Sequence, residues 1–73
     1  MHTTDVIRDG QQLYVGPVTS EGNASADFDR LCGLLASEEE GVGEKTARLI
    51  RNGDVIASYT YVEGMLAHAF DNR

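Results

Sequence analysis

The sequence is poor in cysteine, proline and tryptophan, and its apolar runs are short. Its 73 residues include one cysteine, one proline and no tryptophan. A single cysteine, Cys32, excludes an intrachain disulfide and a thiolate metal cage. Secreted chains of this size usually need disulfides, so we expect a reducing, cytoplasmic location. No apolar run exceeds three residues, which argues against a membrane-spanning segment, and Met1–Asp5 lack the basic and apolar regions of a signal peptide.

Positive charge is also scarce. Six Lys and Arg residues stand against twelve Asp and Glu residues, which gives a net charge of −6 and a pI near 4.6. Because nucleic-acid affinity depends on neutralising phosphates, direct binding to nucleic acid is not expected. Negative charge favours fast association with a basic protein instead. A chain of this length is expected to form one domain, residues 1–73, with a small margin of stability.

Three segments carry clear secondary-structure patterns. Asp9-Gly10 between β-forming residues predicts a hairpin near residues 5–19. Alternating β-forming residues predict a strand over residues 54–61. A helix is predicted near residues 24–37. The apolar residues that recur there at helical spacing are Ala24, Phe28, Leu31, Cys32 and Leu35.

The rest of the chain adds a second helix and an open choice. Apolar residues at helical spacing predict a helix near residues 62–71. Residues 44–52 fit either a helix that ends at Asn52-Gly53 or a strand that turns there, and good helix formers slightly favour the helix. The predicted fold is therefore α+β, with helices packed on one face of a short antiparallel sheet.

A glycine turn, Gly41-Val42-Gly43, is followed by Glu44-Lys45-Thr46-Ala47 and Leu49-Ile50. Residues 41–50 resemble the hairpin and second helix of a helix-hairpin-helix DNA-binding motif, in which backbone N–H groups at a helix N-terminus bind phosphate. The resemblance implies phosphate contacts at Gly41, Gly43 and Lys45, with Arg48 and Arg51 on the same helix. The upstream half departs from the family, because Glu39 and Glu40 stand where it usually has an apolar residue and a proline. Their charge would repel a phosphate. An ordinary glycine-rich turn accounts for the same residues.

No residue pattern points to catalysis or to a cofactor. His2 and His68 are the only histidines, and neither has metal-ligand spacing to a second histidine or to a cysteine. Cys32 lies on the apolar stripe of the predicted helix, which is typical of a core thiol. Residues 43–46 lack the upstream glycine of a phosphate-binding P-loop. We therefore expect neither an enzyme nor a protein that needs a metal or cofactor.

Two features suit a protein-binding surface. Four carboxylates lie close together in sequence, at Glu38, Glu39, Glu40 and Glu44. They would imitate phosphates toward a basic partner, or they would form an ordinary solvated loop. Tyr59 and Tyr61 share one face of the predicted strand. They are interface anchors if exposed, and otherwise they cover the sheet under the helices.

In size, charge and architecture the chain is similar to the small acidic inhibitors that phages and mobile elements encode, such as anti-CRISPR proteins. The resemblance implies a non-enzymatic inhibitor or adaptor that acts as a nucleic-acid mimic, its acidic face masking a basic, nucleic-acid-binding surface of a partner protein. One alternative is a helix-hairpin-helix-type nucleic-acid-binding accessory protein. Another is a structural homodimer subunit, paired through the edge strand that contains Val15 to Val18.

Overall fold

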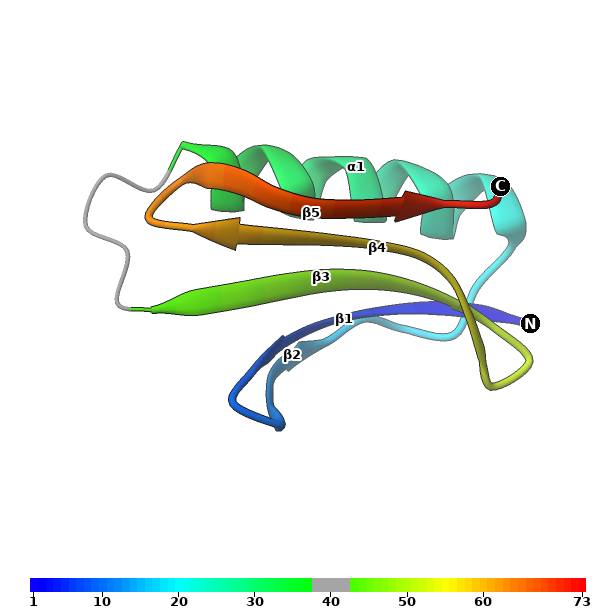
Figure 1. The fold of residues 1–73 in the computed structure, drawn as a ribbon. Helices are drawn as coiled ribbons and strands as arrows, with labels where there is room; N and C mark the ends of the chain where they lie inside the picture. The colour runs from blue at the N-terminus through cyan, green and yellow to red at the C-terminus, as the bar shows by residue number, and fades with distance from the viewer. Residues whose placement is uncertain (38–42) are drawn as a thin grey trace.

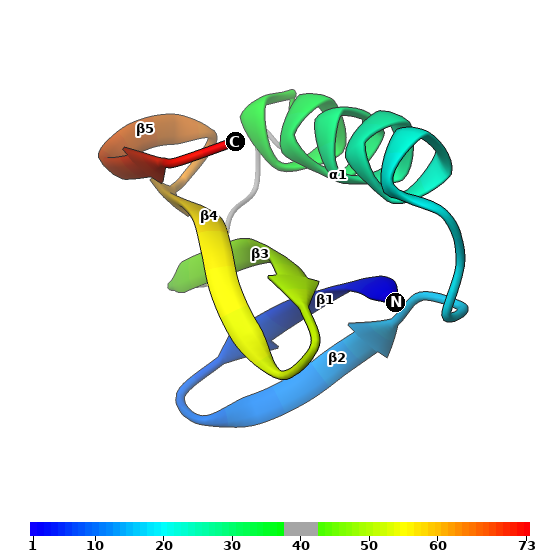
Figure 2. The same cartoon turned by 90° about the vertical axis from the view of Figure 1, so that its right-hand side faces the viewer.

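A computed structural model describes residues 1–37 and 43–73 (Figure 1). In chain order these residues form β1 (His2–Arg8), β2 (Gln11–Val15), α1 (Glu21–Ala36), β3 (Glu44–Arg51), β4 (Asp54–Val62) and β5 (Met65–Asp71). The strands build one antiparallel sheet in the order β2-β1-β3-β4-β5. Helix α1 lies along one face of this sheet, as Figures 1 and 2 show. The predicted α+β class is confirmed.

Three two-residue turns connect neighbouring strands. Asp9-Gly10, Asn52-Gly53 and Glu63-Gly64 have positive φ at both positions, as a type I′ turn requires. The twist of such turns matches the twist of the strands, so each turn closes a tight hairpin. The hairpin predicted near residues 5–19 and the strand predicted over residues 54–61 are both present, as β1–β2 and β4.

The helix predicted near residues 62–71 is wrong, because this segment consists of the turn Glu63-Gly64 and strand β5. β5 pairs with β4 along its whole length, and a β-bulge interrupts the register between Thr60 and Tyr61. Across the bulge the apolar residues of β5 lose the two-residue alternation of a regular strand. The spacing of these apolar residues therefore resembles that of a helix. The segment is nevertheless a strand, because it pairs with β4.

Residues 44–51 form strand β3, so the slight preference for a helix in this segment is also wrong. β3 lies in the middle of the sheet, where Leu49 is opposite Thr4 of β1 and Ala57 of β4. Hydrogen bonding on both sides outweighs the moderate helix propensity of these residues. Asn52-Gly53 is accordingly a hairpin turn and not the end of a helix.

Helix α1 confirms the helix predicted near residues 24–37, with bounds at Glu21 and Ala36. It begins at the N-cap Ser20, whose hydroxyl accepts a hydrogen bond from the N–H of Asn23 at 3.4 Å. The predicted apolar stripe faces the sheet and forms the core with it. The buried apolar residues are Val6, Ala24, Phe28, Leu31, Leu35, Ala47, Leu49, Ile56 and Ala57.

The face of the sheet away from α1 is uncovered within the described residues (Figure 2), yet it holds a buried ion pair. Thr4 donates a hydrogen bond to Asp27 of α1 at 2.6 Å, so Asp5, the next residue of β1, points to the opposite face. The side chain of Asp5 is 1% exposed. Arg48 donates to its two carboxylate oxygens at 2.8 and 2.5 Å, and Gln12 adds a bond at 3.2 Å.

Candidate protein-binding surface

The internal ion pairs decide which charges remain available to a partner. Three arginines bind aspartates of the same chain through contacts of 2.5 to 3.0 Å. These pairs are Arg30–Asp27, Arg48–Asp5, Arg73–Asp29 and Arg73–Asp71. A large part of the scarce positive charge is thereby held within the fold.

Arg73 connects the end of β5 to α1. Its guanidinium lies 5.1 Å from the centre of the Phe28 ring and donates a hydrogen bond to the hydroxyl of Ser25 at 2.7 Å. It also donates to the carboxylate of Asp71, which lowers the pKa of Asp71 to about 2. The Tyr59 hydroxyl donates to the same carboxylate at 3.0 Å. Asp71 is therefore ionised and bound by the chain's own donors.

Acid is expected to weaken the fold through Asp71. Its pKa is about 2 in the folded chain and 3.8 ordinarily, so the ionised carboxylate stabilises the fold above about pH 4, and this stabilisation is lost as the pH falls toward 2. For a partly exposed carboxylate the loss is at most about 1 kcal/mol. Urea unfolding at neutral pH and near pH 3 should show a smaller pH dependence in Asp71→Asn than in the wild type. An equal pH dependence in the two proteins would contradict this assignment.

The structure does not assemble the phosphate site of the helix-hairpin-helix interpretation. Gly43 has a positive φ and leads into strand β3, so no helix begins after it. The helix N-terminus that would bind phosphate is therefore missing from this place. Arg48 is bound to Asp5, while Lys45 and Arg51 lie near opposite ends of β3. Gly41 lies outside the described residues.

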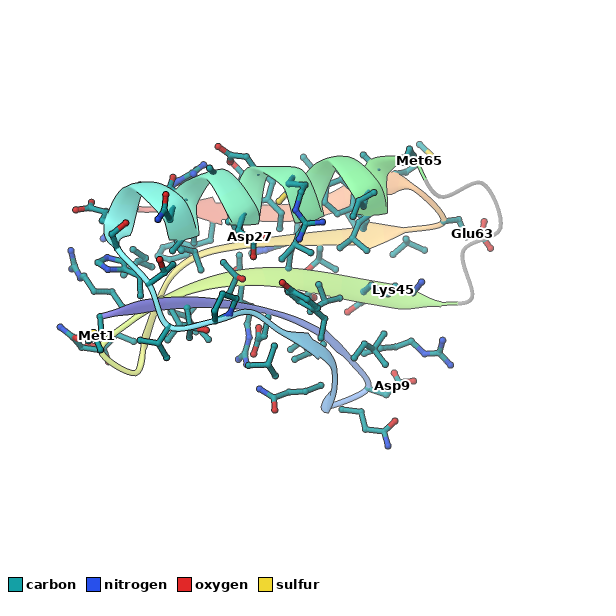
Figure 3. All side chains as sticks on the ribbon, turned by 180° about the vertical axis from the view of Figure 1, so that it is seen from behind. Met1, Asp9, Asp27, Lys45, Glu63 and Met65 are labelled. Atoms are coloured by element: carbon teal, nitrogen blue, oxygen red, sulfur yellow. The ribbon has the colours of Figure 1, made fainter. Side chains whose placement is uncertain are left out.

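The acidic cluster is described in part. Glu38, Glu39 and Glu40 lie outside the described residues, whereas Glu44 is exposed at the start of β3, opposite Val62 of β4. Glu63 follows Val62 in the next turn and is also exposed. Figure 3 shows Glu63 at the end of the molecule where α1 ends. We call Glu44 and Glu63 the acidic end.

Two more exposed carboxylates, Glu21 and Asp54, lie at the other end of the molecule, where α1 begins and β3 turns into β4 (Figure 1). Glu21 occupies the first turn of α1, where the helix dipole favours an anion. Asp54 stands opposite Arg51 in the β3–β4 register. At the acidic end Glu44 instead stands opposite the apolar Val62, and Lys45 points to the other face of β3.

Tyr59 and Tyr61 lie on the sheet face under α1, which is the second of the two predicted alternatives. The ring of Tyr59 meets Phe28 edge to face, with 5.5 Å between ring centres. Tyr61 is half-buried against the core. Burial raises the pKa of Tyr61, and the bond to Asp71 raises the pKa of Tyr59. Both rings pack against the core. They are therefore not exposed as the anchors of an interface would be.

The remaining residues that could carry chemistry are dispersed. His2 is buried in β1, and His68 is exposed on β5 and not on a helix. Cys32 is half-buried, and burial raises the pKa of its thiol. Within residues 1–37 and 43–73, no group of three His, Cys, Asp or Glu side chains could hold a metal ion. In the same part of the chain, no helix is both long and apolar enough to cross a membrane.

Comparisons with known protein families, with curated proteins and with solved structures find no match to this chain.

Proposed function

We propose that this chain is a protein-binding inhibitor or adaptor whose acidic end docks on a basic, nucleic-acid-binding surface of a partner protein and masks it. One observation carries the proposal: Arg30, Arg48 and Arg73 are held by aspartates of the chain itself. Outside these pairs eight carboxylates stand against three Lys and Arg residues, so most of the net charge of −6 lies there. Such a surface attracts a basic protein and repels nucleic acid.

The acidic end is favoured over the opposite end because its charges have no evident structural use. Glu21 stands where the helix dipole favours an anion, and Asp54 stands opposite a cation, Arg51, in the strand register, although no ion pair joins these two within the described residues. Neither Glu44 nor Glu63 takes part in an ion pair within the described residues. Paired strands and a tight turn hold both backbones, so little backbone conformational entropy is lost on binding.

The conformation of Glu63 supports the same choice. Its φ is 52°, and the equivalent first turn positions are occupied by Asp9 and Asn52. Asn and Asp tolerate this left-handed conformation well, whereas it is strained for other side chains. Turn formation alone therefore does not explain a glutamate here, and strained residues often have a functional reason. Display of a carboxylate at this corner is such a reason.

Removing the two carboxylates of the acidic end should weaken partner binding without weakening the fold. The informative variant is Glu44→Gln with Glu63→Asn, because asparagine suits the turn better than glutamate. We expect its affinity for the partner to fall about tenfold, and that of Glu44→Lys with Glu63→Lys about a hundredfold. The partner is first captured from native cell extract on the immobilised wild-type chain and identified by mass spectrometry. Each affinity is then measured by calorimetry with the purified partner.

The matched control is Glu21→Gln with Asp54→Asn, which removes two charges from the opposite end. It should bind the partner nearly as the wild type does, and double-stranded DNA should compete with the wild-type chain for the partner. Equal losses in the control and the acidic-end variant would refute the proposed location. If reversing Glu44 together with Glu38, Glu39 and Glu40 left binding unchanged, the acidic mechanism would be wrong.

A further inference from the structure

The outer edge of β5 is free along its whole length, because no described strand pairs with it. Every residue of β5 is exposed, and residues 65–70 carry no Asp, Glu, Lys or Arg. Met65 is 75% exposed and Phe70 46%. An apolar edge strand without charges is a template for pairing with another chain, which natural proteins usually prevent with lysine, proline or a covering segment.

The other sheet edge, β2, is better protected. β2 is shorter, begins with two glutamines and is followed by Pro17, which has no N–H to donate. The chain after β2 remains tied to β1, because Gly16 donates to Thr4 at 2.7 Å and Thr19 donates to His2 at 2.8 Å. The edge containing Val15 to Val18, expected from the sequence to pair in a homodimer, is therefore the weaker candidate.

The backbone of β5 shows which groups face outward. The N–H of Asn72 donates to the carbonyl of Ile56 at 2.9 Å, so the backbone polar groups of Asn72 face β4. Backbone direction alternates along an antiparallel strand, which places the N–H and C=O of Ala69 and Asp71 on the free edge. This part of β5 lies beyond the β-bulge, so its register with β4 is regular. It therefore presents an ordered row of unpaired donors and acceptors.

We propose that β5 pairs antiparallel with β5 of a second copy of this chain, about a twofold axis at Ala69. This register aligns the outward N–H and C=O of Ala69 with those of its copy, so that each Ala69 donates to the other. It also brings His68 opposite Phe70 of the second copy, on the sheet face away from α1. The sheets of the two copies then become continuous.

The charges along β5 select a second copy as the occupant. Each chain carries a net charge of −6, so two copies associate only through a region where like charges do not meet. In the proposed register no two carboxylates are opposite each other, and Asp71 is neutralised by Arg73 of its own chain. A basic partner protein would find no negative side chain along residues 65–70. This inference is independent of the acidic end.

Self-association through β5 is tested by sedimentation equilibrium from micromolar to about millimolar concentrations of the chain. Ala69→Pro removes the outward N–H at the axis, and Ala69→Lys places two ammonium groups opposite each other. Both should raise the dimer dissociation constant by more than about tenfold. Val15→Lys makes the matched change on the β2 edge and should leave the constant unchanged. Circular dichroism checks that each variant is folded. If Ala69→Pro does not fold, the dissociation constant of Ala69→Lys alone tests the proposed interface.

Three results would overturn the inference. One is a wild-type chain that stays monomeric over the whole range, including the case in which β5 adds to a strand of another protein. The second is a dimer that survives Ala69→Lys. The third is a dimer lost in Val15→Lys alone, which would assign the interface to β2. Because Glu44→Lys with Glu63→Lys should leave the dimer intact, failure of this inference is distinguishable from failure of the proposed function.

Discussion

Replacing Arg48 with methionine is expected to lower the free energy of unfolding by about 3–5 kcal/mol, because it leaves a buried carboxylate without its counter-ion. Asp5 is 1% exposed and receives two hydrogen bonds from the Arg48 guanidinium. Among the described side chains, Gln12 alone would continue to donate to it. Since a small domain has a total stability of about 5 kcal/mol, Arg48→Met should be largely unfolded in mild urea.

The double variant Asp5→Leu with Arg48→Met separates loss of the pair from exposure of a lone charge. Replacing both partners by apolar side chains is often neutral or stabilising, so the double variant should recover most of the stability lost in Arg48→Met. Urea unfolding followed by circular dichroism gives the three free energies. A double variant as unstable as Arg48→Met would mean that the arginine acts through packing, and the ion-pair explanation would be wrong.

Replacing Phe28 with alanine should cost a similar amount, about 3–5 kcal/mol, because it opens a cavity where helix and sheet meet. Phe28 is fully buried and contacts Tyr59 edge to face. The guanidinium of Arg73 also lies over its ring, so the substitution removes a support of the contact between the end of β5 and α1. Thermal and urea unfolding should both show the loss.

Leu34 provides the control for Phe28 within the same helix. Its side chain is 54% exposed, so Leu34→Ala removes a side chain of comparable hydrophobicity without opening a cavity. We expect a change within about 0.5 kcal/mol. If the two variants lost the same stability, α1 would not be docked through Phe28, and the arrangement of the core would have to be revised.

The sequence correctly predicted the elements that have a local residue pattern and bury only one face. Phe28 and its neighbours recur at helical spacing because only one side of α1 meets the sheet, and Asp9-Gly10 is a strong turn signal. The prediction failed at Glu63-Gly64, because glutamate is not a typical residue for this turn and the β-bulge hides the alternation of β5. Residues 44–51 form a strand because they pair with β1 on one side and β4 on the other. The helix propensities of single residues carry no information about such long-range pairing.

The surface was harder to predict than the fold, because most of its features depend on contacts between distant residues. The sequence suggested Arg48 as part of a phosphate site because its partner Asp5 lies 43 positions away and no local pattern shows their ion pair. Glu63 was not singled out, since it was assigned to a helix. Tyr59 and Tyr61 were correctly placed on a common face, but the alternation could not tell a covered face from an exposed one.

The position of β1 between β2 and β3 has a consequence for how the chain folds. Among the described strand pairs, three join neighbours in sequence through two-residue turns, and only β1–β3 joins distant segments, residues 2–7 and 46–51. Helix α1 lies within the loop that this pairing closes. The entropy of long-range loop closure is therefore lost in one step, which aligns the central strands and seats the helix together. Hairpin formation on either side needs only local search.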